Sequence, residues 1–306
     1  MENLLVNKVA AVKEVRQAAE YQKKKQACIL TGLAGSSKPV FFAAADKLLG
    51  GKGSMAFITA SREEIRTYRR ELNYLYPDLP MQELYPVSLP RVQADTQSLE
   101  LQAGRAAALR FLSGEERGIV FITAEALQQK QLRPSGMSGK ALQLAVGEEH
   151  EQRNIAAALL DLGYERTEQV DALGQFCLRG DILDVYPINS SAAVRIEWFD
   201  NELDAMRSFD VDTQRSLQTL TSIKIAPLKV DESFSYDADI FEYCAADTMV
   251  VVDEPVHVFS MLEKLDKENK EHASELFGKQ ELIEQLDANG AVLVSALGHS
   301  YLQQLP

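Results

Sequence analysis

The sequence predicts an α/β fold in which a parallel sheet is interrupted by a smaller α+β domain. Five short apolar runs, each bounded by turn residues, are typical of buried strands. Segments with helical spacing separate them, and strands that alternate with helices form a parallel sheet covered on both faces. The alternation of strands and helices stops in the middle of the chain and then resumes. This predicts one discontinuous domain with a second domain inserted into it. The five runs lie at 27–31, 55–59, 118–123, 249–252 and 291–294.

The remaining elements follow in order along the chain. A helix is expected over 1–26, a second begins at Ser61 with a capping box completed by Glu64, and an alanine-rich helix occupies about 95–112. The inserted part predicts a helix near 150–162, and two amphipathic helices follow the insert near 256–266 and 270–286. We place the domain boundaries at 1–137, 138–210 and 211–306. The strands predicted in the insert are 175–179, 181–186, 194–199 and 206–209.

Composition narrows the class of protein. The 306 residues are 46% hydrophobic and 25% charged, which is usual for a folded globular chain. An acid at Glu2 and the lysines at positions 8 and 13 disagree with a signal peptide, so we expect a cytoplasmic protein. The three cysteines are far apart in apolar runs and predict reduced thiols, and the scattered histidines predict no metal site.

Charge is divided unevenly along the chain. Residues 1–140 carry a net charge of +6 and residues 141–306 carry −19. Affinity for nucleic acid comes largely from neutralised phosphates, so the acidic part predicts little or no DNA binding. The basic residues Arg62, Arg66, Arg69 and Arg70 leave two interpretations open, a solvated helix face or a non-specific DNA clamp.

A degenerate phosphate loop follows the first predicted strand. The loop pattern is Gly, any four residues, Gly, Lys, then Ser or Thr, between a strand and a helix. Gly32 and Lys38 match, and Gly35 lies inside the loop, but Ser37 replaces the second glycine and Pro39 replaces the hydroxyl residue. The glycine lets the backbone curl around phosphate, and the hydroxyl binds magnesium. Proline supplies neither a hydroxyl nor an amide donor, but it suits the first position of a helix. We therefore expect no ATP hydrolysis here.

An acidic pair, Asp253 and Glu254, ends the apolar run at 249–252. In nucleotide hydrolases such a pair holds magnesium and polarises the attacking water. Acids followed by a proline are also an ordinary helix start. The alternative to a binding module is thus a weak or vestigial ATPase that uses Lys38 with this pair, and the sequence contains no other catalytic constellation.

Four ordered segments resemble the second domain of UvrB, the helicase-fold protein of bacterial nucleotide excision repair. The same domain occurs in the N-terminal UvrB-homology module of the transcription-repair coupling factors (Mfd). The flanking α/β parts resemble a helicase-type (RecA-like, P-loop) domain split around that insert. The segments are 146–149 (VGEE), 159–166 (LLDLGYER), 174–187 (GQFCLRGDILDVYP) and 195–204 (RIEWFDNELD).

Two departures separate the chain from UvrB and favour the coupling-factor module. UvrB keeps a complete phosphate loop, and it carries a longer, tyrosine-rich hairpin where this chain has only Tyr85 between positions 84 and 98. The chain thus resembles an excised N-terminal fragment of a coupling factor. The resemblance assigns ATP, magnesium, RNA polymerase and double-stranded DNA to domains outside these 306 residues.

The resemblance implies that the module recruits UvrA, the damage-recognition ATPase, by imitating the UvrB surface that UvrA binds. Carried over by position, the UvrA-binding candidates are Arg166, Arg179 and Glu197, with Phe176 beside a family arginine that is Cys177 here. That cysteine is expected to weaken the contact or shift it to neighbours. The residues alone leave simpler roles open: a surface charge at Arg179 and a local ion pair at Arg166. Alternation predicts that Glu197 is exposed and that Trp198 is buried.

Overall fold

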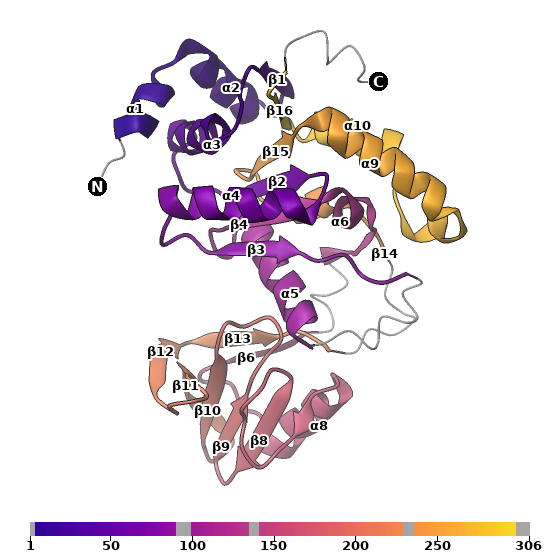
Figure 1. Ribbon diagram of the computed structural model, residues 1–306. Coiled ribbons are helices and arrows are strands. Elements are labelled where there is room, and N and C mark those ends of the chain that lie inside the picture. Colours follow the sequence, from indigo (N-terminus) through magenta and orange to yellow (C-terminus); the bar gives the residue numbers. More distant parts are fainter. Residues whose placement is uncertain (1–3, 90–98, 135–140, 229–235, 298–306) are drawn as a thin grey trace. The chain divides into compact units, whose positions relative to one another are not determined.

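The structure is a computed structural model that describes residues 4–89, 99–134, 141–228 and 236–297, and it divides into two compact units. The ribbon is drawn in Figure 1. The first unit comprises Met1–Ala94, Ala108–Gln131 and Asp237–Pro306. The second comprises Asp95–Ala107 and Leu132–Tyr236.

A six-stranded parallel sheet forms the centre of the first unit, in the order β1-β16-β15-β2-β4-β3. Its central strands are short apolar runs that are buried along their whole length, as a sheet covered on both faces requires. The strands are β1 (Cys28–Thr31), β2 (Met55–Thr59), β3 (Met81–Leu84), β4 (Ile119–Thr123), β15 (Met249–Asp253) and β16 (Val292–Ser295).

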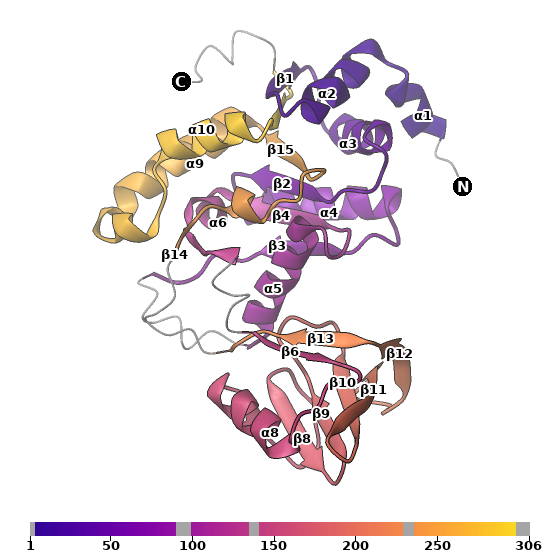
Figure 2. The same cartoon turned by 180° about the vertical axis from the view of Figure 1, so that it is seen from behind.

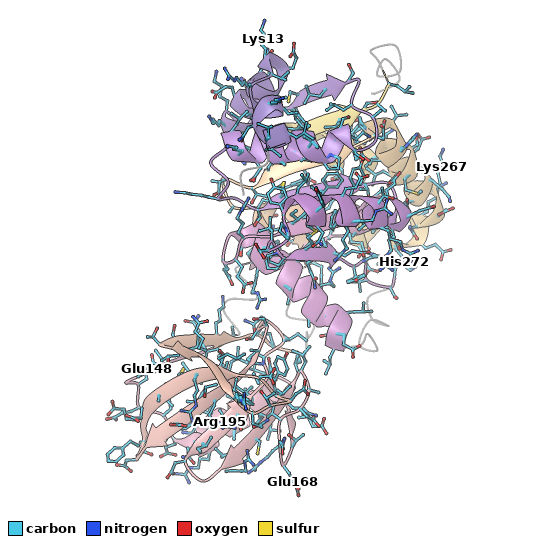
Figure 3. All side chains as sticks on the ribbon, turned by 60° about the vertical axis from the view of Figure 1, so that its left-hand side comes forward. Lys13, Glu148, Glu168, Arg195, Lys267 and His272 are labelled. Atoms are coloured by element: carbon cyan, nitrogen blue, oxygen red, sulfur yellow. The ribbon has the colours of Figure 1, made fainter. Side chains whose placement is uncertain are left out.

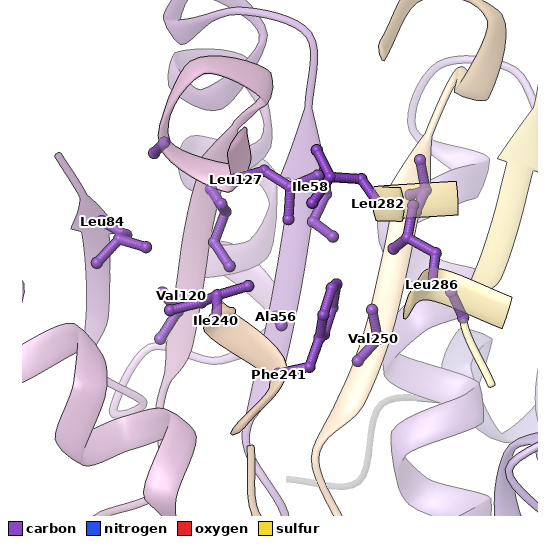
Figure 4. Packing of buried hydrophobic residues seen from close by; sticks show 14 of the residues in the cluster. Ala56, Ile58, Leu84, Val120, Leu127, Ile240, Phe241, Val250, Leu282 and Leu286 are labelled. Carbon is purple, nitrogen blue, oxygen red and sulfur yellow. The ribbon is translucent and has the colours of Figure 1, made fainter. Parts of the chain in front are cut away.

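Helices cover both faces of this sheet. α1 to α4 pack on one face, against strand residues that include Phe57 and Phe121. The alternate strand residues, such as Ile58 and Val120, face the other layer. Figure 4 shows Leu282 of that layer near Ile58, and Ile240 near Val120. The first layer is α1 (Leu4–Ala10), α2 (Lys13–Lys23), α3 (Ser37–Leu48) and α4 (Arg62–Leu75). The second layer includes α5 (Leu99–Ser113), α6 (Ala124–Gln128), η2 (Ile240–Tyr243), α9 (Pro255–Glu268) and α10 (Lys279–Ala288), with η3 (Lys270–Glu275) between the last two.

The second unit contains a mostly antiparallel sheet that packs against the helix α8. Its order is β12-β11-β10-β9-β8-β7, and only the β7–β8 pair is parallel. One face packs with the helix into a separate core that contains Phe176, Ile196 and Trp198. Figure 2 shows the unit from behind. Its elements are β6 (Leu142–Ala145), α8 (Gln152–Asp161), β7 (Glu165–Arg166), β8 (Gln175–Arg179), β9 (Ile182–Val185), β10 (Ala193–Phe199), β11 (Glu202–Phe209), β12 (Ser216–Leu220) and β13 (Ser222–Ile225).

The structure differs from the sequence prediction at several element ends and in strands that the sequence did not predict, among them β3, β6, β12 and β13. The helix expected over 1–26 is two helices with a break after Ala10. The α/β alternation does not return at 211, because β12 and β13 still belong to the second unit, which ends at Tyr236. The helix expected near 270–286 is a 3₁₀ turn followed by α10. A short ribbon of β5 (Gln131–Leu132) and β14 (Tyr236–Ala238) lies where the chain passes between the units.

Several smaller expectations can be compared with the structure. The capping box of α4 is present, with Glu64 Oε2 accepting the Ser61 N–H at 3.1 Å. All three cysteines are free thiols. Within the described ranges, no group of His, Cys, Asp and Glu side chains has the arrangement of a metal site, and no helix has the length and apolarity needed to cross a membrane. The short stretch expected to replace the UvrB hairpin lies largely outside the described residues, since 90–98 are not among them.

Candidate functional site

The degenerate phosphate loop connects β1 to α3. Gly32 and Gly35 have φ of +82° and +53°, a backbone region that glycine adopts without steric cost. Both loop hydroxyls are bound within the chain: Ser37 Oγ donates to the Ala34 carbonyl at 2.7 Å, and Ser36 Oγ donates to Glu71 at 2.9 Å. The loop between β1 and α3 thus contains two glycines with positive φ, and both of its serine hydroxyls are bound within the chain.

Lys38 closes this loop onto the end of β15. Its Nζ donates to Asp253 Oδ1 and to Glu254 Oε1, each at 2.6 Å. Only 4% of Lys38 is exposed, and Asp253 is buried to the same degree. The sequence singled out the lysine and the acidic pair separately, and the fold brings them into one buried ion cluster because β1 and β15 both flank β16.

The remaining oxygen atoms of the acidic pair also have partners. The Tyr68 hydroxyl donates to Asp253 Oδ2 at 2.7 Å. Ser295 Oγ donates to Glu254 Oε2 at 3.0 Å, and the Ala296 N–H donates to Glu254 Oε1 at 2.9 Å. We call Lys38, Tyr68, Asp253, Glu254 and Ser295 the lysine network. Glu254 has φ of +44°, a strained conformation for a residue with a side chain, and these bonds hold it there.

Burial and charge act in opposite directions on the pKa values of the lysine network. Burial alone lowers the pKa of Lys38, but its hydrogen bonds to Asp253 and Glu254 outweigh this and raise it. Burial raises the pKa of Glu254, and the bonds from Lys38 and the Ala296 N–H outweigh it, so the pKa is lowered. For Asp253, burial is the larger effect and the pKa is raised in spite of Lys38.

These residues do not fit a bound nucleotide with magnesium. A phosphate-binding loop needs a lysine free to reach phosphate and a hydroxyl free to bind the metal ion. Here Lys38 already has two carboxylates, and Pro39 occupies the position of the hydroxyl residue. Pro39 is the third residue of α3 rather than the first, a place where the missing N–H leaves no intrahelical bond unmade. The lysine network therefore joins the loop to β15.

A second group of charged side chains covers one face of the antiparallel sheet. We call Arg179, Asp184, Arg195, Glu197 and Arg207 the charged face. The cross-strand pairs Cys177–Asp184 and Asp184–Arg195 put these positions on the side opposite to the second unit's core. Figure 3 shows Arg195 among these strands. The arginines and carboxylates come from four neighbouring strands, β8 to β11.

Asp184 is the centre of the charged face. Only 2% of it is exposed. Arg195 binds it with both ends of its guanidinium, Nε to Oδ1 at 2.6 Å and Nη2 to Oδ2 at 2.7 Å, and Arg179 Nη2 donates to Oδ2 at 3.3 Å. The bonds to Asp184 raise the pKa of Arg195. A two-pronged arginine–carboxylate pair fixes orientation, so Asp184 positions both arginines.

The predicted UvrA-binding residues do not all lie together. Arg179 has a side chain that is 55% exposed, and Glu197 is partly exposed and pairs with Arg207, so both belong to the charged face. Arg166 is in register with Phe176, which places it on the opposite side of the sheet from Arg179. Among the described residues Arg166 has no ion pair, so the local pair with a neighbouring glutamate is not formed.

Phe176 is a core residue. It is completely buried in the core of the second unit, next to Val185 in the neighbouring strand. A residue without accessible surface cannot contact a partner, so Phe176 is withdrawn from the expected binding set. Trp198 is buried as predicted, and its Nε1 donates to the His150 carbonyl at 2.9 Å.

Cys177 occupies a small apolar pocket rather than an exposed position. It is buried against Val170 and Phe209, and its Sγ donates to the Glu168 carbonyl at 3.0 Å. A partner protein therefore cannot contact the Cys177 side chain directly. Any compensation for the family arginine must come from neighbours on the charged face.

Sequence reasoning missed three members of the charged face and one exposed aromatic residue on the same side of the sheet. Asp184, Arg195 and Arg207 looked like ordinary strand charges, because their partners lie on other strands. Phe199 follows Glu197 by two positions on the same side of β10 and is 76% exposed, which is unusual for a large aromatic residue. The only available signal was the alternation of charged and apolar residues in β9 and β10.

Fold and site together define a class of protein: a chain with an α/β unit that contains the lysine network and an antiparallel unit that contains the charged face. Comparison with known proteins finds a match for the second unit. Residues 142–230 match the family model described as the UvrB interaction domain.

Between about half and two thirds of the chain is similar to the transcription-repair-coupling factors. It is 36% identical over 203 residues to that of Bacillus subtilis strain 168, covering 66% of this chain and 17% of the relative. It is 32% identical over 202 residues to that of Staphylococcus haemolyticus, with 65% and 17% coverage. For Escherichia coli K12 the identity is 28% over 165 residues, with 54% and 14% coverage. The chain is thus related to these factors and matches about a sixth of their length.

Proposed function

We propose that this chain is a UvrA-recruiting module in transcription-coupled nucleotide excision repair, which imitates the UvrB surface that UvrA binds. The observation that carries the proposal is the charged face, because it lies on the UvrB interaction domain and includes two of the residues expected to contact UvrA. RNA polymerase, DNA translocation and ATP belong, in this proposal, to parts of a longer coupling factor outside these residues.

The chemistry of the charged face supports a protein partner. Arginine and aromatic side chains concentrate binding energy in interfaces; the charged face has exposed Arg179 on β8, and Phe199 is exposed on β10 of the same sheet. Asp184 holds Arg179 and Arg195 in place before any partner arrives, which lowers the entropy lost on binding. Arg166 lies on the other side of the sheet and would contact UvrA only if UvrA reaches around the β7 edge.

A titration of the chain with UvrA tests this proposal. The Arg179→Ala variant should bind UvrA at least about tenfold more weakly, a loss of about 1.4 kcal/mol. Arg153→Ala is the matched control, because Arg153 is an arginine of the same unit, 82% exposed and paired only with Glu151 on the surface. Equal binding by wild type and Arg179→Ala, or equal loss in both variants, would contradict the proposal.

The second part of the proposal is that this segment hydrolyses no nucleotide. The lysine network supports it, since Lys38 is engaged by two carboxylates and Pro39 provides no metal ligand. A ligand that binds only the native state raises the melting temperature once its concentration exceeds its dissociation constant. Adding ATP with magnesium should leave the melting temperature of the chain unchanged, whereas a rise that Lys38→Met abolishes would favour the ATPase alternative.

A further inference from the structure

A groove on the first unit lies outside both sites described so far. It runs between α4 and the segment 77–81 that leads into β3, and it encloses about 890 Å³. Arg66, Arg69, Arg70 and Asn73 line the helix side. All of these residues belong to one unit, so the groove is complete within it. We call it the arginine groove.

Two of the three arginines have no partner of their own. Arg69 is anchored: its Nη1 donates to the Met81 carbonyl at 3.1 Å, and its guanidinium lies 5.4 Å from the centre of the Phe121 ring. Arg66 and Arg70 are exposed, and within the part of the chain that the structure describes neither forms an ion pair or a hydrogen bond. Like charges four residues apart destabilise a helix by about 0.2–0.5 kcal/mol. Their placement therefore does not serve the stability of α4.

The opposite wall of the arginine groove is mostly apolar. Pro77, Leu79, Pro80 and Met81 line it, with Asp78 as its one charge. A suitable ligand must present carboxylates or phosphates to the guanidinium groups and apolar atoms to this wall. Asp78 limits the negative charge that the groove accepts, so a few spaced carboxylates suit it better than a densely charged polyphosphate. A nucleic-acid backbone has no apolar side chain for the wall.

We propose that the arginine groove binds an acidic segment of a partner protein. Carboxylates of that segment pair with Arg66 and Arg70, and an apolar side chain between them packs against Leu79 and Met81. The site is independent of UvrA recruitment through the charged face, because none of its residues belongs to the second unit.

Fluorescence anisotropy of the full chain tests the proposal. The probe is a short fluorescein-labelled peptide of aspartate and glutamate with a central leucine. The comparison peptide has asparagine and glutamine in place of the acids. We expect saturable binding of the acidic peptide only, and weaker binding as salt rises, because exposed ion pairs are screened.

Two charge-reversal variants locate the binding. In Arg66→Glu/Arg70→Glu the affinity should fall at least about tenfold. The control Lys264→Glu/Lys267→Glu reverses two exposed cations on α9 of the same unit and should leave the affinity unchanged. Arg66→Gln/Arg70→Gln removes the charges with little change in helix propensity. It should also bind the peptide more weakly, and this loss could not be attributed to a disturbed fold.

Three outcomes would overturn the proposal. The first is no saturable binding of the acidic peptide to the wild-type chain. The second is equal binding by wild type and Arg66→Gln/Arg70→Gln. The third is tighter binding of a duplex DNA oligomer than of the peptide, abolished by the same variants, which would make the groove a phosphate-backbone site.

Discussion

Lys38 and Asp253 are separated by 215 positions in the chain, yet their side chains meet at 2.6 Å in a buried site. A buried ion pair contributes little over an apolar replacement, but removing one partner leaves an uncompensated charge. Each member of the lysine network therefore stabilises the fold, because it pairs with a buried polar group that would otherwise have no partner.

Lys38→Met should destabilise the chain by about 3 kcal/mol, because Asp253 and Glu254 would lose their shared cation. Urea unfolding at neutral pH measures this. Lys267→Met removes an exposed partner of Glu263 and should change the free energy of unfolding by less than about 1 kcal/mol. A cost for Lys38→Met no larger than that of the control would show that the lysine network is not structural.

The cost of Lys38→Met should also depend on pH. Burial raises the pKa of Asp253 even in the presence of Lys38, and without the lysine the lowering effect on both acids disappears. The pKa of Asp253, which burial already raises, then lies still further above its unfolded value, so the native variant binds more protons at this carboxyl and gains stability as pH falls. Unfolding measured at pH 7 and pH 5 should show a smaller deficit at the lower pH. An unchanged deficit would contradict this explanation.

Asp184→Asn tests the centre of the charged face. The substitution keeps the shape but removes the charge that holds Arg179 and Arg195, so the second unit should lose about 3 kcal/mol. UvrA binding should weaken as well, because both arginines lose their fixed positions. Glu151→Gln, at an exposed acid of the same unit, is the control for both measurements. Destabilisation without weaker binding would mean that Asp184 supports only the fold.

At the scale of elements, close approach of backbones fixes the edge of the parallel sheet. Gly290 precedes β16 with φ of +65°, and a Cβ there would lie 2.6 Å from the Lys25 backbone just before β1. β1 and β16 are neighbouring parallel strands, joined further by the Cys28 N–H to the Ala291 carbonyl at 3.1 Å. The turn before one strand thus packs directly on the turn before the other.

Gly290→Ala should therefore cost more than about 2 kcal/mol, since the substitution adds a clash to an unfavourable φ. Gly35→Ala is the matched control: its φ is also positive, but a Cβ there meets nothing within 4 Å. It should cost about 1 kcal/mol. Thermal or urea unfolding measures both, and equal costs would contradict the close approach.

The elements that the sequence predicted well are those with a strong apolar pattern. β2, β4 and β15 are buried at every position and were located within a residue or two. β12 was missed because four of its five residues are exposed, so no alternation marks it as a strand. Because β12 was not predicted, the predicted domain boundary lies at 210, whereas the second unit ends at Tyr236.

The two sites differed in how far sequence reasoning could go. The phosphate loop and the acidic pair can each be recognised from a local sequence pattern. Their contact depends on the order of the strands in the sheet, which a local pattern does not reveal. Arg179 and Glu197 were named from a resemblance. Asp184, which positions Arg179, has no signal in the sequence because its partners come from β8 and β10.

At the scale of the whole molecule, the two units have separate cores. The second unit's core contains fourteen buried residues, all between Leu144 and Ile225. A fragment of residues 132–236 should therefore fold alone and unfold in one cooperative step. Circular dichroism during urea unfolding measures this, and a fragment without a cooperative transition would show that the second unit depends on the first.

The same fragment gives the most direct test of the central claim, that the UvrB interaction domain recruits UvrA through its charged face. UvrA is titrated against the folded fragment, the full chain and the Arg179→Ala form of each. We expect equal affinity for the fragment and the full chain, and a loss of at least about tenfold in both variants. A folded fragment that does not bind UvrA while the full chain does would contradict it, because the binding surface would then lie outside the charged face.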